Sequence, residues 1–184
     1  GRMASGHLQG RLLKMLVQLS GAKRILEIGT FSGYATICLS EGLPADGVVH
    51  TFEVNDEQED FTRPWLEGRY DHCGMADEVF RRIRFHIGDA RTLLPEIDEP
   101  FDLAFIDGDK RQYIECYELV MSHMRPGGLI LADNTLWDGH VLEANTHEAM
   151  TVGIKEFNDH VLRDPRVTRV MLPLRDGLTM IRIL

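Results

Sequence analysis

The chain has 184 residues, of which 43% are hydrophobic, so it is long enough for one α/β domain and too short for two ordinary domains. Its 29 acidic and 20 basic residues give a net charge of −9, the wrong sign for binding nucleic acid or an anionic membrane surface. Three scattered cysteines, no signal-peptide pattern and no long apolar run are typical of a cytoplasmic protein. We therefore expect a single domain over residues 1–184. Because a helical pattern begins almost at once, we also expect an N-terminal segment to be missing.

Predicted helices and strands alternate along most of the chain. Apolar residues at helical spacing predict a first helix from residue 8 that ends at Gly21. Apolar and β-branched runs predict strands at 24–28, 48–54, 83–87, 101–106 and 129–132, and the segments 34–42, 56–70, 90–94, 112–124 and 148–162 are predicted helices. The turn 125–128 is expected to introduce the fifth strand, and 69–76 is expected to be a surface loop. This alternation is typical of a parallel sheet with helices on both faces.

The C-terminal part of the chain departs from this alternation. Strands are predicted at 167–172 and 178–184, and the five residues between them are too few for a crossover helix. We therefore expect a hairpin whose antiparallel strand completes a mostly parallel, seven-stranded sheet.

The carboxyl ends of the first three predicted strands carry residues suited to a nucleoside-like ligand. Ligands of open α/β sheets bind beyond these strand ends. Gly29 and Gly33 would let the backbone approach a ligand closely, and Glu53 could accept hydrogen bonds from both ribose hydroxyls. Asp89 and Ala90 follow the third strand, where they would frame an adenine.

The loop after the first strand indicates which ligand this is. Dinucleotide sites favour G-x-G-x-x-G, whereas the spacing here is G-x-x-x-G, and Glu27 precedes it. A carboxylate at that position opposes a diphosphate and suits a cationic ligand. S-adenosylmethionine, with its sulfonium and amino groups, is such a ligand.

Polar residues also follow the strands predicted at 101–106 and 129–132. Asp107, Asp133 and Asn134 offer three hard oxygen ligands, which suit Mg²⁺, with Mn²⁺ and Ca²⁺ as alternatives. Two adjacent phenolic oxygens could take two further positions on such a cation, whose charge would lower their pKa. Lys110, at the start of a helix, is then the candidate general base that removes a phenolic proton.

Three longer runs carry a family resemblance. LEIGTFSGYAT, FIDGDKRQY and LADNTLWDGHV resemble the metal-dependent O-methyltransferases typified by catechol and caffeoyl-coenzyme A O-methyltransferases. The resemblance extends from about Met3 to the final DGLTMIRI, and DNTLW points to the caffeoyl-coenzyme A branch and its bacterial relatives. It implies a Rossmann-like class I methyltransferase fold, a small catechol-like acceptor and a homodimer.

The two lines of argument together give the candidate site residues. Contacts to S-adenosylmethionine are expected from Ser5, Glu27, Gly29, Thr30, Gly33, Ala35, Glu53, Asp89, Ala90, Asp107 and Asp109. The metal is assigned to Asp107, Asp133 and Asn134, catalysis to Lys110 and Asp107, and substrate contacts to Lys110, Trp137 and Asp138.

Some positions depart from the family pattern. Ala35 stands where many relatives have a serine, Asp138 stands where the plant enzymes have a substrate-binding asparagine, and the segment 60–83 is longer than in those enzymes. Two alternatives also stay open, a nucleotide-dependent oxidoreductase and a non-catalytic protein that binds S-adenosylmethionine.

Overall fold

The computed structural model describes residues 5–69 and 76–184, so most of the loop predicted at 69–76 lies outside the described residues. The chain divides into two compact units, Gly1–Glu99 and Pro100–Leu184. The prediction of a single domain stays a prediction. No helix in the described ranges combines the length and the apolar character needed to cross a bilayer.

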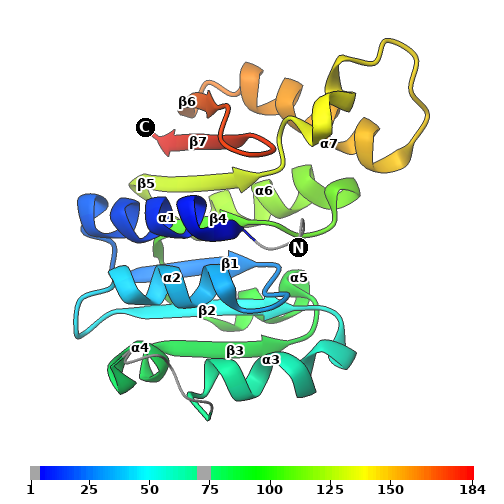
Figure 1. Cartoon of the computed structure of the whole chain (residues 1–184). Helices are drawn as coiled ribbons and strands as arrows, with labels where there is room; N and C mark the ends of the chain where they lie inside the picture. Colours follow the sequence, from blue (N-terminus) through cyan, green and yellow to red (C-terminus); the bar gives the residue numbers. More distant parts are fainter. Residues whose placement is uncertain (1–4, 70–75) are drawn as a thin grey trace. The chain divides into compact units, whose positions relative to one another are not determined.

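The described residues of the first unit form three parallel strands in the order β3-β2-β1 (Figure 1). They are β1 (Arg24–Ile28), β2 (Val48–Glu53) and β3 (Ile83–Ile87). The last four residues of β1 are all buried, which explains why its sequence does not alternate between apolar and polar residues. Glu27 is the one charged residue among these four.

The helices of the first unit are α1 (Gly6–Ser20), α2 (Tyr34–Gly42), α3 (Glu59–Leu66), α4 (Asp77–Arg81) and α5 (Ala90–Leu93), with 3₁₀ turns η1 (Asp56–Gln58) and η2 (Leu94–Glu96). The helix expected over 56–70 therefore begins as a 3₁₀ turn and ends at Leu66. Gly10 lets helix α1 pack closely on α2, since a Cβ at this position would lie only 2.7 Å from the Cys38 Sγ. Helix α4 was not predicted, since five residues are too few to show a helical period.

The second unit contains four strands in the order β4-β5-β7-β6. They are β4 (Phe101–Ile106), β5 (Met124–Asp133), β6 (Val167–Leu172) and β7 (Leu178–Ile183). Strands β4 and β5 are parallel, and β7 is antiparallel to both of its neighbours, which confirms the predicted hairpin. The predicted turn at 125–128 was wrong. These residues form an irregularity inside β5, where Gly127 has a φ of +77° and the pairing register shifts between Phe101 and Leu103.

The second unit also holds η3 (Lys110–Gln112), α6 (Tyr113–His123), η4 (Trp137–Leu142) and α7 (Ala149–Arg163). The sequence did not predict η4, because it is short and contains left-handed residues at Asp138 and Gly139. Helix α7 begins where the Glu148 side chain accepts hydrogen bonds from the backbone N–H groups of Met150 and Thr151.

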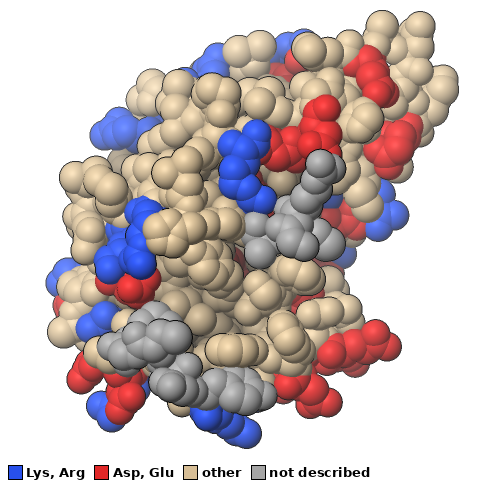
Figure 2. All heavy atoms as spheres, viewed as in Figure 1, with Lys and Arg blue, Asp and Glu red and all other residues tan. Residues whose placement is uncertain are grey.

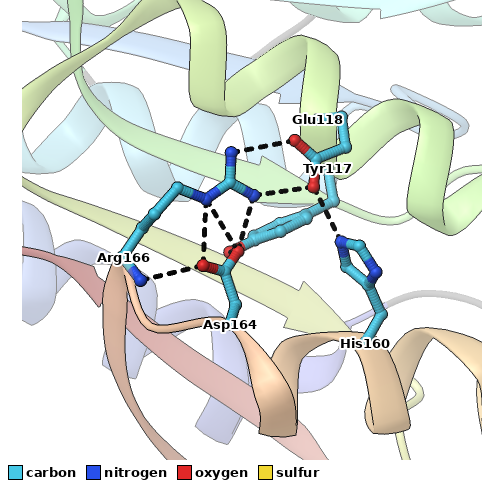
Figure 3. A network of polar contacts seen from close by, with 5 residues as sticks. All are labelled: Tyr117, Glu118, His160, Asp164 and Arg166. Carbon is cyan, nitrogen blue, oxygen red and sulfur yellow. Dashed lines mark hydrogen bonds and ion pairs between the residues drawn. The ribbon is translucent and has the colours of Figure 1, made fainter.

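A polar network joins α6, the end of α7 and the start of β6 (Figure 3). The Arg166 guanidinium binds Asp164 at 2.6 Å and Glu118 at 2.7 Å, and Glu118 also pairs with His160 at 2.7 Å. The Tyr117 hydroxyl donates to Asp164 Oδ2 at 2.9 Å. The side chains of Glu118, His160 and Asp164 present possible ligand atoms within 4.8 Å of one another, as in a metal site. Since Arg166 already supplies the cation, we interpret the cluster as an ion-pair network that stabilises the fold.

This network predicts a pH-dependent contribution to stability. The Arg166 hydrogen bonds hold the pKa of Asp164 well below its usual value. The contribution is therefore complete above the usual aspartate pKa of about 3.9 and is lost as the pH falls through the lower, folded value. Asp164→Asn should lower the free energy of unfolding at pH 7 by about 1.5–3 kcal/mol, and by less below about pH 4.

Urea unfolding at pH 7 and pH 3 measures this difference. Asp159→Asn is the matched control, because Asp159 also pairs with an arginine but its side chain is 62% exposed. An equal effect of the two variants, or a loss for Asp164→Asn that does not depend on pH, would contradict the assignment.

Candidate active site

The predicted cofactor residues of the first unit lie at the ends of its strands. Glu27, near the end of β1, is fully buried, and its Oε2 accepts a hydrogen bond from the Thr36 hydroxyl at 2.5 Å. Charge in so buried a carboxylate is costly unless a cation or hydrogen-bond donors accompany it. The cofactor's amino group could provide both. The structure thus fits a cationic ligand here, and it adds Thr36, which the sequence did not single out.

Glu53 is fixed by the backbone of two loops. Its Oε2 accepts from the Phe31 N–H at 2.8 Å, and its Oε1 accepts from the Asn55 N–H at 2.9 Å. The Gly29 and Thr30 N–H groups both donate to the Phe52 carbonyl. The loop after β1 is therefore tied to the end of β2. Each Glu53 oxygen keeps acceptor capacity for a ribose hydroxyl.

The other predicted cofactor residues of this unit have varied surroundings. Ser5, Thr30, Ala35 and Ala90 are buried. Gly33 has a φ of +77°, and an added Cβ would lie 2.6 Å from the Leu66 side chain, so packing alone accounts for a glycine there.

Asp89 is engaged within the chain. It begins α5, and hydrogen bonds from the Arg91 side chain hold its pKa below the usual value. The Asp89 carboxylate is therefore ionised near neutral pH.

In the second unit, the structure brings the predicted metal and catalytic residues together. Asp107 and Asp133 follow the paired residues Ile106 and Ala132 of neighbouring parallel strands. Lys110 Nζ donates to Asp107 Oδ1 at 2.9 Å, and only 6% of Lys110 is exposed. Burial raises the pKa of Asp107, the Lys110 ammonium opposes this rise, and the nearby Asp133 carboxylate adds to it.

This donor set fits a hard divalent cation. Asp133 is 3% exposed, and its Oδ1 accepts a hydrogen bond from the Asn134 N–H at 2.8 Å, which orients the Asp133 carboxylate. Two close carboxylates and an amide oxygen are appropriate ligands for Mg²⁺. A cation would also relieve the repulsion between Asp107 and Asp133.

Tyr113 belongs to this cluster, although the sequence left it without a role. Its hydroxyl accepts a hydrogen bond from Lys110 Nζ at 2.6 Å and lies 2.9 Å from the Asp133 carbonyl oxygen, to which it can donate. The side chain is fully buried, and burial raises its pKa well above the usual value. It therefore stays protonated and holds Lys110 next to Asp133.

Asp109 does not join this cluster of side chains. It begins η3, and its carboxylate accepts from the Arg111 N–H at 3.0 Å and pairs with the Arg111 guanidinium. This pairing lowers its pKa. Its predicted contact with the cofactor stays a prediction.

Trp137 and Asp138 line a surface hollow of about 320 Å³. Its other lining residues are His140, Glu143, Glu148 and Thr151. Figure 2 shows acidic side chains over this part of the unit, from η4 to the start of α7. The two residues predicted to contact the substrate thus border a concave, acidic surface.

Comparison with known proteins decides the family. The family model described as O-methyltransferase matches residues 1–184. The chain belongs to the O-methyltransferase family. The recognition and the enzyme class predicted from the sequence are thereby confirmed.

Relatives of this O-methyltransferase include plant and bacterial enzymes. It is 34% identical to tricin synthase 1 of Oryza sativa subsp. japonica, over 99% of this chain and 75% of the relative. It is 37% identical to the catechol O-methyltransferase of Niastella koreensis, over 82% of this chain and 66% of the relative. The chain thus spans about two thirds to three quarters of these proteins.

Solved structures confirm the fold class. The O-methyltransferase of Bacillus cereus, in complex with SAH, aligns with a TM-score of 0.87 at 31% identity, over 100% of this chain and 84% of that one. TomG of Streptomyces achromogenes, in complex with SAM, aligns with a TM-score of 0.86 at 29% identity, over 98% of this chain and 82% of that one. The seven strands described above, six parallel and one antiparallel, are those of this class of methyltransferase.

A glycine in α7 of this O-methyltransferase lies against the backbone of Lys110, the candidate base. A Cβ at Gly153 would overlap the Lys110 carbonyl oxygen and lie 3.0 Å from the Arg111 Cα. Gly153→Ala should therefore displace the backbone of Lys110, lower kcat and destabilise the protein by about 1–3 kcal/mol. Steady-state kinetics and thermal unfolding test this, with the exposed Glu156→Ala in the same helix as control. An unchanged kcat would show that Lys110 does not depend on this packing.

Proposed function

We propose that this chain transfers a methyl group from S-adenosylmethionine to a hydroxyl of a small catechol-like aromatic, assisted by a divalent cation, with Mg²⁺ favoured over Mn²⁺ or Ca²⁺. The observation that carries the proposal is the cluster in which the buried Lys110 and Asp133 lie beside the partly exposed Asp107, with Asn134 adjacent. The proposal also includes a cytoplasmic location, which rests on the scattered cysteines, and a homodimer, which rests on the family resemblance.

S-adenosylmethionine supplies a methyl group on a positively charged sulfur. A bound divalent cation would hold two adjacent hydroxyl oxygens and lower their pKa. A neutral Lys110 Nζ would take the hydroxyl proton, and the oxygen would then attack the methyl carbon. The carbon–sulfur bond breaks with its electron pair on sulfur, which leaves S-adenosylhomocysteine.

The remaining residues position the reactants. Glu53 binds the ribose, and Glu27 provides negative charge for the cofactor's amino group. Tyr113 and Asp107 hold Lys110 Nζ by hydrogen bonds of 2.6 and 2.9 Å. Trp137 offers an aromatic wall to the acceptor ring. Alignment of the two reactants supplies most of the rate in such a transfer.

The charge of the hollow beside Trp137 favours a small acceptor. Asp138, Glu143 and Glu148 line it, and these carboxylates repel the phosphates of a coenzyme A thioester. We therefore propose a simple dihydroxy aromatic rather than its coenzyme A ester as the preferred acceptor.

A methyl-transfer assay tests the proposed function. The purified protein is incubated with S-adenosylmethionine and caffeic acid, with Mg²⁺ and separately with a chelator, and caffeoyl-coenzyme A is the comparison acceptor. We expect turnover of caffeic acid that the chelator abolishes, and a lower kcat/KM for the ester. Turnover that survives the chelator would exclude the metal, and binding of the cofactor without turnover of any dihydroxy aromatic would contradict the proposed acceptor.

A further inference from the structure

The segment that follows β5 has an unusual backbone. Asn134, Trp137 and Asp138 have φ values of 60°, 50° and 50°. Residues with side chains rarely adopt this left-handed conformation, and three such residues within five positions need outside support. The segment matters because it carries one proposed metal ligand and the two residues that we expect to contact the substrate.

Asp176, in the loop between β6 and β7, gives that support. Its Oδ2 accepts a hydrogen bond from Asn134 Nδ2 at 3.1 Å, and its Oδ1 accepts from the Asp138 N–H at 2.5 Å. Its backbone carbonyl accepts from the Leu136 N–H at 2.8 Å. One residue therefore binds the beginning, the middle and the end of the segment.

The neighbouring Gly177 lets the two loops approach closely. Its carbonyl accepts from the Thr135 N–H at 3.1 Å, and a Cβ at this position would lie 2.7 Å from the Leu136 nitrogen. Because these contacts use the backbone, they would persist if the Asp176 side chain were changed. The effect of the carboxylate can therefore be measured separately from the packing of the loops.

The carboxylate also determines how the Asn134 amide is oriented. An ionised aspartate can only accept hydrogen bonds, so Asn134 must turn its NH₂ group to Asp176. The Asn134 carbonyl oxygen, the atom that ligates hard cations, is then directed away from Asp176. An asparagine at 176 has one acceptor oxygen for two donors, and its own NH₂ would face a second donor group.

From this geometry we propose that Asp176 is a positioning residue, which orients Asn134 as a metal ligand and fixes the segment that carries Trp137 and Asp138. This inference rests on the proposed function, because it requires a cation at Asp107, Asp133 and Asn134. Asp176 itself is not a ligand in this proposal. Its effect should therefore appear mainly in the affinity for the cation.

Calorimetric titration of the whole protein with Mn²⁺ tests the proposal. Asp176→Asn should weaken Mn²⁺ binding by about 10- to 100-fold, the usual effect of losing a partner that orients a ligand. Binding of S-adenosylmethionine should not change, and kcat at saturating Mn²⁺ should largely recover. Asp159→Asn, an exposed substitution of the same kind, should bind Mn²⁺ as the wild type does.

A double-mutant cycle shows whether Asp176 acts through Asn134. In an Asn134→Ala background, Asp176→Asn should weaken Mn²⁺ binding much less than it does in the wild type. Equal losses in both backgrounds, or wild-type affinity in Asp176→Asn alone, would overturn the proposal and leave the proposed function standing. A wild-type protein that binds no Mn²⁺ would instead refute the metal part of the proposed function, and this inference with it.

Discussion

Asp133→Asn is expected to abolish cation-dependent methyl transfer while the protein still binds S-adenosylmethionine. Asp133 is 3% exposed at the end of β5, and it is one of two carboxylates that we assign to the cation. Loss of a ligand-orienting partner typically costs 10- to 100-fold in metal affinity, so loss of a ligand should cost more than about 100-fold. Calorimetry measures the affinities for Mn²⁺ and for S-adenosylmethionine, and turnover assays over a range of Mg²⁺ concentrations measure the cation-dependent activity.

The substitution is chosen so that the fold survives it. Asparagine keeps one oxygen that can accept from the Asn134 N–H, and its NH₂ group then takes the place of the carboxylate oxygen that we assign to the cation. The hydrogen bond that the Tyr113 hydroxyl donates to the Asp133 carbonyl uses only the backbone of residue 133. Asp102→Asn is the matched control, because it breaks an ion pair with Arg125 in the same unit without touching the cluster. Activity in Asp133→Asn that Mg²⁺ still stimulates to the wild-type level would remove Asp133 from the metal site.

Much of the fold and part of the candidate site could be predicted because the residues at strand ends are easy to recognise. The strands at 24–28, 83–87, 101–106 and 167–172 are buried or paired runs whose limits agree with the structure. Polar residues directly after neighbouring parallel strands must meet at one edge of the sheet. Asp107 and Asp133 were therefore paired correctly from the sequence, and Lys110 lies beside Asp107 as expected.

The residues that support this cluster could not be predicted, because their contacts are distant in sequence. Asp176 binds Asn134 across 42 positions, and Tyr113 reaches the Asp133 carbonyl across 20. No periodicity marks such contacts. The same applies to Gly153, whose lack of a side chain matters only because α7 packs on the Lys110 backbone.

Local signals failed where tertiary contacts override them. The sequence RPGG at 125–128 has the composition of a turn, yet it continues strand β5 as an irregularity beside β4. Gly33 was assigned to the cofactor from its spacing, and this assignment stays a prediction, but a Cβ there would also lie 2.6 Å from the Leu66 side chain. A glycine pattern therefore does not distinguish approach to a ligand from approach to a neighbouring side chain.

Lys110→Met is expected to lower kcat by about 10²- to 10⁴-fold, the usual contribution of a general base, with little change in cofactor affinity. Methionine keeps the length and the apolar stem of this buried side chain but cannot take a proton. Single-turnover methyl transfer at saturating Mg²⁺ measures the effect on the chemical step. Lys23→Met, which removes an exposed lysine paired with Asp46, is the control and should leave kcat unchanged.

Lys110→Arg separates proton transfer from simple electrostatics. Arginine keeps a positive charge beside Asp107, but it stays protonated in proteins and cannot act as a base. If Lys110 removes the hydroxyl proton, Lys110→Arg should be nearly as slow as Lys110→Met. If the positive charge alone matters, Lys110→Arg should retain most of the wild-type kcat. That second result would leave the ion pair with Asp107 as the function of Lys110, and another group would have to accept the proton.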